Sequence, residues 1–305
     1  MTRHFTELSD LGKAGLTQVL DDADRWLSVR GRPEAPRPLA GKSIALVFEK
    51  ASTRTRLSLE VAVVELGGHP IVLSSDGSQL GRGEPMTDTA RVLSRMVHGV
   101  TIRTFAHERL LELVRASTIP VLNALTDHSH PMQLLADLQT VRRVKSRLEG
   151  LSYAWIGDGN NMANSWIEAA GLLGLRLTLA CPEGYDPDPA ELDRARQRGA
   201  QLRIVRDAKQ AAANADVIST DVFTSMGQER EREKRLRAFA GMSVTEELVA
   251  LGASDVMVLH CLPAHRGEEI SAEVIDGPHS HVWDQAEARL HTSKAALRWA
   301  LEPDV

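Results

Sequence analysis

The sequence predicts an α/β protein with two domains, each built on a central parallel sheet that is flanked by helices. Apolar runs of strand length alternate with helical patterns from about residue 42 to residue 290, an alternation typical of parallel α/β architecture. The chain has 305 residues, of which 43% are hydrophobic and 25% charged, so it is long enough to form two separate cores.

Four strands are expected in the first half, separated by helices. The clearest helix covers residues 54–68, where Leu57, Val61 and Val64 share one face and a Gly-Gly pair ends the pattern. The expected strands are residues 43–48, 70–75, 99–105 and 119–125.

The second half repeats this scheme. Its expected strands are residues 152–157, 175–182, 200–207, 216–223 and 256–263, and its clearest helices are residues 160–174 and 188–199. A charged helix end meets a glycine within residues 142–152, which predicts domains at 1–147 and 148–305. A last helix, about 286–305, could pack on either domain.

Composition excludes several classes of protein. The net charge of −5 argues against a general nucleic-acid binder, and no run reaches the roughly 18 to 20 apolar residues of a membrane span. The first residues lack the features of a signal peptide, so we expect a cytoplasmic protein. Cys181 and Cys261 lie far apart without CxxC spacing, which favours reduced thiols over a disulfide or zinc site.

The segment "STRT", residues 52–55, lies where an expected strand passes into a helix. Free backbone N–H groups and the helix dipole favour an anion at such a position. Ser52 and Thr53 can cap the helix or donate hydroxyl hydrogen bonds, and Arg54 and Arg56 offer planar donors suited to phosphate oxygens. The alternative is a Ser/Thr helix cap with solvated arginines.

Other polar residues follow strands of the first half. Arg103 ends one strand, and His130 and Gln133 follow another at the start of a helix. Singly, Arg103 could be a surface ion-pair partner and His130 a turn residue. Because ligands of open parallel sheets bind outside the carboxyl ends of strands, these residues together predict a site for a polar anion.

In the second half, "GDGNN" (residues 157–161) also lies at a strand-to-helix turn. It does not complete the dinucleotide fingerprint, because Met162 occupies the third glycine position, and its two asparagines could be helix caps. Asp221 and Ser225 follow one later strand, and His260 and Cys261 follow the last. The charged run 228–237 is expected to be solvated and mobile, with a lid as a second possibility.

Five segments in this order resemble the ornithine carbamoyltransferases of the aspartate/ornithine carbamoyltransferase family, almost end to end. They are "FEKASTRTR" (48–56), "HPMQLLADLQT" (130–140), "GDGNNMANS" (157–165), "DVFTSMGQE" (221–229) and "HCLPAHRG" (260–267). The motifs "SMG" and "HCLP" distinguish this group from the aspartate carbamoyltransferases. The resemblance implies transfer of the carbamoyl group of carbamoyl phosphate to L-ornithine, giving L-citrulline and phosphate, in arginine biosynthesis.

The resemblance also implies the site residues. Carbamoyl phosphate would be bound by Ser52, Thr53, Arg54, Thr55, Gln79, Arg103, His130, Pro131, Met132, Gln133, Cys261, Leu262 and Arg289, with Gln79 contributed across a subunit boundary. Ornithine would be bound by Asn161, Asp221, Ser225 and Met226. Trimers, or assemblies of trimers, are implied. No cofactor or metal is expected, because carbamoyl phosphate arrives activated with phosphate as a good leaving group.

Two positions depart from the family pattern. Met132 replaces a common cysteine, and Ala288 replaces an asparagine next to Arg289, whose setting it could loosen. Neither change removes an assigned side chain.

The expected chemistry is attack of a neutral amine on a carbonyl, although ornithine's side-chain amine has a lysine-like pKa near 10.4. Asp221 and the Cys261 region would orient that amine. Arg103, His130 and Thr55 would stabilise the developing oxyanion, and Arg54 would stabilise the departing phosphate.

Three alternatives remain at this stage. The first is a carbamoyltransferase acting on putrescine or an acylated ornithine, since sequence gives no geometry for the substrate's α-amino and α-carboxylate groups. The second is a nucleotide-dependent oxidoreductase built on "GDGNN", which would leave "STRTR" and "HPMQ" without a role. The third is a non-enzymatic ligand-sensing homologue.

Overall fold

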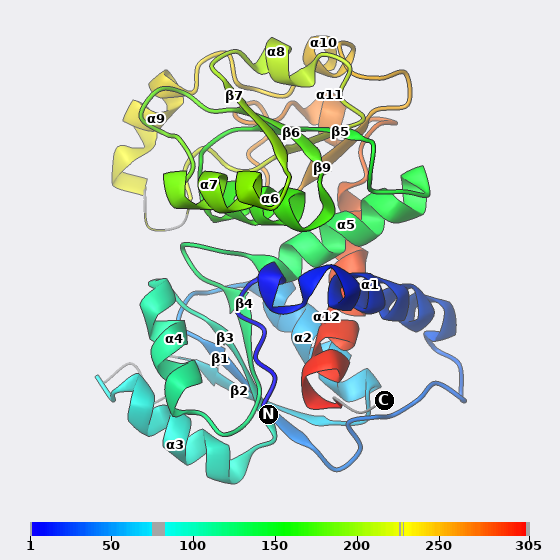
Figure 1. Cartoon of the computed structure of the whole chain (residues 1–305), viewed down its shortest axis with the longest axis vertical. Coiled ribbons are helices and arrows are strands. Elements are labelled where there is room, and N and C mark those ends of the chain that lie inside the picture. The colour runs from blue at the N-terminus through cyan, green and yellow to red at the C-terminus, as the bar shows by residue number, and fades with distance from the viewer. Residues whose placement is uncertain (1, 75–82, 226, 228, 303–305) are drawn as a thin grey trace. The chain divides into compact units, whose positions relative to one another are not determined.

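The computed structural model describes residues 2–74, 83–225, 227 and 229–302. Within it the chain forms two compact units, one of residues 1–139 with 287–305 and the other of residues 140–286. Each unit contains one sheet of parallel strands with helices on both faces. The predicted fold class is therefore confirmed, and Figure 1 labels its elements.

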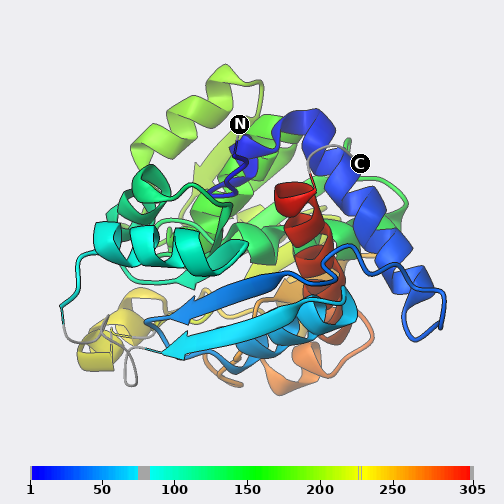
Figure 2. The same cartoon turned by 90° about the horizontal axis from the view of Figure 1, so that it is seen from below.

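The first unit carries a four-stranded sheet in the order β2-β1-β3-β4. Its elements are η1 (Leu8–Asp10), α1 (Gly12–Val29), β1 (Ser43–Phe48), α2 (Thr53–Glu65), β2 (His69–Ser74), α3 (Met86–Met96), β3 (Gly99–Arg103), α4 (His107–Ala116), β4 (Val121–Leu125) and α5 (Pro131–Lys145). The last helix of the chain, α12 (Val282–Leu301), belongs to this unit from Glu287 onward. Figure 2 shows β1 and β2 as neighbouring arrows with the same direction.

The two faces of this sheet bury different residues because side chains alternate along a strand. Ala45 and Val47 of β1 pack with Val100 and Ile102 of β3 under α3 and α4. In Figure 1, α2 and α12 lie on the other side of the sheet. That arrangement leaves the start of α2 beside the carboxyl end of β1.

The second unit carries a five-stranded sheet in the order β7-β6-β5-β8-β9. Its strands are β5 (Ser152–Ile156), β6 (Arg176–Ala180), β7 (Gln201–Val205), β8 (Val217–Thr220) and β9 (Met257–His260). Its helices are α6 (Asn161–Leu173), α7 (Pro189–Gln197), α8 (Ala208–Ala212), η4 (Glu229–Glu231), α9 (Arg232–Ala238), α10 (Glu246–Val249) and α11 (Ala272–Ile275).

In each sheet the strand order reverses beside the first strand of the unit. The chain leaves β1 toward β2 and returns to β3, and it leaves β5 toward β6 and returns to β8. Open α/β sheets bind ligands outside the carboxyl ends of strands at such switch points. The segments that follow β1 and β5, 52–55 and 157–161, lie at these two points.

The helix predicted over residues 54–68 is present as α2, but the apolar face that identified it in the sequence is not the face that α2 buries. Leu57 is 62% exposed and Val64 is 55% exposed, whereas the buried face includes Thr55, Leu59 and Val63. On the buried face, Thr55 contacts Arg103 at the end of β3. The exposed apolar face therefore needs an explanation other than the core of this chain.

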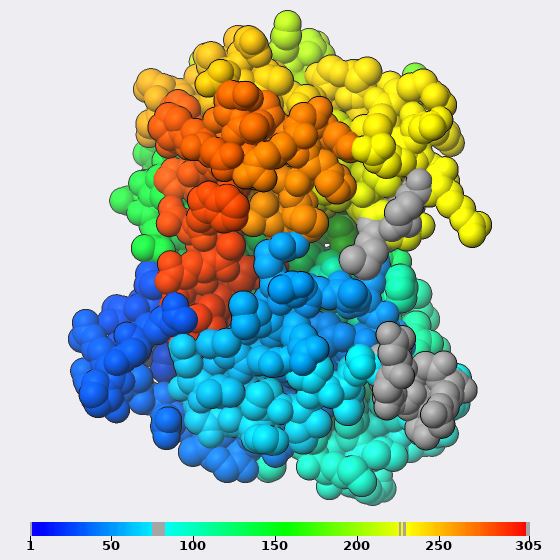
Figure 3. Space-filling model, turned by 180° about the vertical axis from the view of Figure 1, so that it is seen from behind, coloured from blue at the N-terminus to red at the C-terminus, as the bar shows by residue number. Residues whose placement is uncertain are grey.

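The expectation of a solvated run at 228–237 is also wrong in part. Most of it forms η4 and α9, which lie on the surface (yellow in Figure 3), but Arg235 is only 4% exposed. Its guanidinium lies over the rings of Tyr185 and Phe239, at 4.8 and 5.4 Å from their centroids. The buried Arg235 thus attaches α9 to the rest of the second unit, although the sequence of this segment is mostly charged.

Candidate active site

The strand register of the first unit brings the predicted anion ligands to one edge of its sheet. Phe48 pairs with Arg103, and Arg103 pairs with Leu125, so β1, β3 and β4 end together. The "STRT" segment follows the first of these strands and His130 follows the last. The sequence places these residues far apart, and the parallel sheet gathers them.

The start of α2 has the geometry of an anion site. The Ser52 side chain accepts a hydrogen bond of 3.2 Å from the Thr55 backbone N–H, which makes Ser52 the helix cap. Backbone N–H groups of the first helical turn carry the positive end of the dipole. Arg56 points elsewhere, because its side chain is 57% exposed and pairs with Glu60.

Thr55 is the meeting point of two arginines. Its hydroxyl oxygen accepts hydrogen bonds from Arg103 Nη1 at 3.3 Å and from Arg289 Nη2 at 3.1 Å. Arg289 also donates to Gln133 Oε1, and Gln133 donates to Asp137 at 2.8 Å. Two guanidinium groups therefore converge on one buried hydroxyl beside the helix start.

His130 is buried at the start of α5, next to these cations. Burial, with the positive charges of Arg289 and Arg103, holds the pKa of His130 well below its ordinary value of 6.5. Its ring is therefore neutral at physiological pH, as electrostatics requires beside two arginines. A neutral imidazole can donate one hydrogen bond to a carbonyl oxygen without adding charge.

In the second unit, Asp221 gathers two neighbouring groups. It follows β8 and is 8% exposed; its Oδ1 accepts from Cys261 Sγ at 2.9 Å and its Oδ2 from the Asn160 amide at 3.1 Å. The strand register brings this about, because Ile156 pairs with Thr220 and Thr220 with His260. The segments after β5, β8 and β9 thus meet at one carboxylate.

The residues after β9 are held by a buried pair that the sequence interpretation missed. His260 Nε2 lies 3.0 Å from Glu269 Oε1, and both side chains are fully buried. His260 Nδ1 accepts from the Leu262 backbone N–H at 2.8 Å, which fixes the turn after Cys261. Since both ring nitrogens are engaged, His260 has no lone pair to complete a metal site with Asp221 and Cys261, although the donor atoms lie within 4.8 Å.

Gly159 of "GDGNN" has a structural reason that needs no dinucleotide. A Cβ on Gly159 would lie 2.2 Å from the Pro187 backbone nitrogen, so only glycine fits. Asn160 caps α6 by accepting from the backbone N–H groups of Met162 and Ala163. This confirms the helix-cap interpretation for Asn160 and removes the observation behind the oxidoreductase alternative.

Arg235 and Asp158 also escaped the sequence interpretation. Arg235 donates to Asp158 and to the Phe223 carbonyl oxygen, so it connects α9 to the segments after β5 and β8. Burial raises the pKa of Asp158 despite the opposing effect of Arg235. No local signal in the sequence separates Arg235 from the other arginines of this charged run.

Comparison with known proteins identifies both units. Residues 3–143 match the domain family described as "Aspartate/ornithine carbamoyltransferase, carbamoyl-P binding domain". Residues 149–300 match the one described as "Aspartate/ornithine carbamoyltransferase, Asp/Orn binding domain". The chain belongs to the aspartate/ornithine carbamoyltransferase family.

Relatives within the family match over nearly their whole length. An ornithine carbamoyltransferase of Acidothermus cellulolyticus is 54% identical over 307 residues, covering 99% of this chain and 97% of the relative. The solved ornithine carbamoyltransferase of Pyrococcus furiosus has a TM-score of 0.94 at 42% identity, covering 100% of this chain and 98% of that one. The anabolic ornithine carbamoyltransferase of Campylobacter jejuni has a TM-score of 0.92 at 38% identity, covering 98% of both chains.

The carbamoyltransferase fold places the predicted site residues in two sets, one in each unit. The contacts above join Ser52, Thr55, Arg103, Gln133 and Arg289 in the first unit, and Asp221 and Cys261 in the second. Thr53 and Arg54 form the first turn of α2, Pro131 and Met132 begin α5, Asn161 begins α6, and Leu262 and Ser225 follow their strands. Gln79 and Met226 lie outside the described residues.

Ala288 is buried, and the neighbouring Arg289 still reaches Gln133 and Thr55, so the family asparagine is not needed for that contact. Among the described helices, none combines the length and the hydropathy that crossing a bilayer requires.

Proposed function

We propose that this carbamoyltransferase acts on L-ornithine, transferring the carbamoyl group of carbamoyl phosphate to its side-chain amine to give L-citrulline and phosphate in arginine biosynthesis. The observation that carries the assignment of carbamoyl phosphate is the convergence of Arg103 and Arg289 on Thr55, beside a neutral His130. The names of the relatives support ornithine as the acceptor.

The phosphate group binds at the start of α2 in this proposal. Ser52, Thr53 and Thr55 offer hydroxyl and backbone N–H groups, and Arg54 offers a bidentate donor. As the C–O bond to phosphate breaks, negative charge accumulates on the leaving group. Arg54 and the helix dipole stabilise that charge where it develops.

The carbonyl oxygen of carbamoyl phosphate faces Arg103 and His130. Attack by an amine places negative charge on this oxygen, and preorganised donors stabilise it without reorganising. His130 serves as a neutral donor because its pKa is lowered. Pro131, Met132 and Gln133 line the same side of carbamoyl phosphate, because they follow His130 in the first turn of α5.

Ornithine binds to the second set. The Asp221 carboxylate pairs with a positively charged amino group of ornithine. By analogy with the family, Asn161, Ser225 and Met226 provide the remaining contacts. The Cys261 thiol and the Leu262 backbone orient the reacting amine, which must lose a proton before it attacks. The hydrogen bond of Cys261 to Asp221 supports this shared role.

Homotrimers in the cytoplasm, with Gln79 acting across a subunit boundary, are part of the same proposal. The exposed apolar face of α2, with Leu57 and Val64 more than half exposed, supports an association of subunits. Apolar faces of this kind mark interaction sites in otherwise polar surfaces.

The test is a product assay with purified protein. Carbamoyl phosphate is mixed separately with ornithine, putrescine, N-acetylornithine or aspartate, and ureido product and phosphate are measured. The proposal expects turnover with ornithine at least ~10²-fold faster than with the others, because a site built for charged groups rejects analogues that lack them. Faster turnover of putrescine or N-acetylornithine would overturn the assignment.

A matched pair of variants tests the phosphate site. Arg54→Ala should lower kcat by ~10²- to 10³-fold, the usual cost of losing one electrostatic donor. Arg56→Ala removes an arginine from the same helix that pairs with Glu60 on the exposed side, so it should retain normal kinetics. Equal effects of the two changes would contradict the assignment of Arg54.

A further inference from the structure

One face of α12 carries a stripe of ionisable side chains. Glu287, His291, Lys294 and Arg298 follow one another at intervals of four, three and four residues, which places them on one side of a helix. Such a stripe ordinarily faces water. Here the side chain of His291 is fully buried, and those of Lys294 and Arg298 are only 3% and 15% exposed.

The stripe is paired with residues of two other helices of the first unit. Lys294 donates to Glu65, the last residue of α2, and Arg298 donates to Asp22 in α1. Arg30, just after α1, bridges Glu65 at 3.4 Å and Glu287 at 3.6 Å. Ion pairs therefore connect α12 to both α1 and α2.

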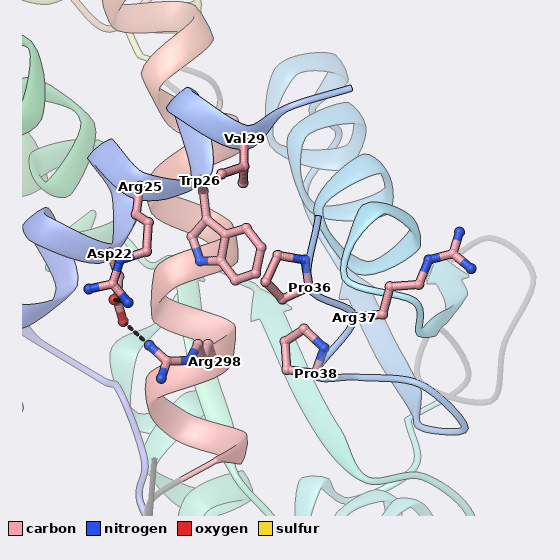
Figure 4. A pocket seen from close by; sticks show the side chains of 8 residues that line it. All are labelled: Asp22, Arg25, Trp26, Val29, Pro36, Arg37, Pro38 and Arg298. Atoms are coloured by element: carbon pink, nitrogen blue, oxygen red, sulfur yellow. Dashed lines mark hydrogen bonds and ion pairs between the residues drawn. The ribbon is translucent and has the colours of Figure 1, made fainter. Parts of the chain in front are cut away.

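A pocket lies beside the carboxyl-terminal end of the stripe. A cavity of about 430 Å³ lies there, lined by Trp26, Pro36, Pro38 and the Asp22–Arg298 pair among others. Figure 4 shows the Trp26 ring beside α12, with Pro36 and Pro38 across from it. Arg298 of α12 lines this pocket and donates to Asp22 of α1, so an ion pair connects the two helices there.

The same two helices, α2 and α12, meet again at the candidate site. Thr55 lies ten residues before Glu65 on α2, and Arg289 lies five residues before Lys294 on α12. The contact between Thr55 and Arg289 spans 3.1 Å. Because a helix rises about 1.5 Å per residue, a slide of α12 by one or two ångströms would separate them.

We propose that the Lys294–Glu65 ion pair is a positioning device that fixes the axial position of α12 and so holds Arg289 against Thr55. The Lys294 side chain is 3% exposed and that of Glu65 is 31% exposed. Ion pairs that are partly or fully buried often add little stability over apolar residues of similar size, and register is their best-attested role. The inference rests on the proposed function in one respect, because Arg289 is assigned there to carbamoyl phosphate.

The test compares Lys294→Met/Glu65→Leu with the wild type. We expect its KM for carbamoyl phosphate to rise about tenfold, while the KM for ornithine and the midpoint of urea unfolding stay within error, since small displacements of positioned groups are costly. Lys294→Arg keeps the charge and should stay close to wild type. A matched control replaces the exposed pair Glu108 and Arg115 of α4 in the same way and should change nothing.

The route through Arg289 is tested by a double-mutant cycle. In an Arg289→Ala background, Lys294→Met/Glu65→Leu should have no further effect on the KM for carbamoyl phosphate, because the residue to be positioned is absent. The inference would be overturned if the two changes had additive effects on this KM. It would also be overturned if replacing the ion pair left the KM unchanged in the chain that keeps Arg289. If the double variant does not fold, Glu65→Gln, which keeps an acceptor for Lys294, should give a smaller rise in the same constant, and no rise would also overturn it.

The two proposals fail in different ways. If the wild type does not carbamoylate ornithine, the proposed function is wrong. If the wild type is active and the ion-pair variants match it, only the positioning role of Lys294 and Glu65 is wrong.

Discussion

His291 provides a prediction whose magnitude follows from the structure. The ring is fully buried on α12. Burial and the nearby Lys294 charge lower its pKa from 6.5 to about 4, and the Glu287 carboxylate opposes them only in part. The histidine is thus neutral in the folded chain at any pH above about 4, whereas in the unfolded chain it takes up a proton below 6.5.

This difference in pKa determines whether acid stabilises or destabilises the folded chain. Between pH 6.5 and 4 the unfolded state binds more protons, so the free energy of unfolding falls as the pH falls. Above pH 6.5 the group contributes no pH dependence, and below pH 4 both states are protonated. A shift from 6.5 to about 4 corresponds to roughly 3 kcal/mol, since one pKa unit is about 1.4 kcal/mol.

The assay is urea unfolding of the wild type and His291→Asn at several pH values from 7.5 to 4. The difference in unfolding free energy between them cancels the carboxylate titrations that they share, and it should change by about 3 kcal/mol in favour of the variant on acidification. His69→Asn, at an exposed histidine, controls for the loss of a histidine. A difference that stays constant across this range would refute the reasoning.

Three further predictions concern the two sets of site residues. Thr55→Val removes the oxygen that accepts hydrogen bonds from Arg103 and Arg289. Hydrogen bonds to charged groups contribute about 1.5 to 3 kcal/mol each, so the KM for carbamoyl phosphate should rise at least ~10-fold. An unchanged KM in steady-state kinetics would speak against this. Arg235→Met leaves the Asp158 carboxylate without its cation and should lower the free energy of unfolding by about 3 kcal/mol in urea titrations. Adding Asp158→Asn should restore much of that free energy. If it does not, the loss comes from the packing of Arg235 and not from the unpaired carboxylate. Since the lowered pKa keeps His130 neutral, kcat/KM should show no acid limb near pH 6.5 from this residue, and a limb there that vanishes in His130→Gln would contradict that protonation state.

Much of the fold could be read from local patterns. Apolar runs of strand length and helical spacing depend on neighbouring residues, so the alternation of strands and helices followed from the sequence. The strand-to-helix turns were also local, and they located Ser52, Thr55 and Asn160 at helix starts. Motif order then indicated the family.

The orientation of α2 was not a local property. Leu57, Val61 and Val64 share a face, but the helix buries the face that contains Thr55. Apolar periodicity indicates that one face of a helix is apolar. It does not distinguish a face buried in the core of the same chain from one that contacts another molecule. Arg235 was missed for a related reason, because the rings of Tyr185 and Phe239 and the Asp158 carboxylate that bury it come from distant parts of the sequence or from outside the charged run.

The sequence by itself determined which segments become strands, which turns can hold an anion, and to which family the chain belongs. Tertiary structure decided which of these turns meet, because strand order within a parallel sheet is set by crossovers and packing rather than by any one segment. It alone brought Arg289 to Thr55 across 234 residues of chain. It also lowered the pKa of His130, since that shift requires burial and two cations from distant parts of the sequence.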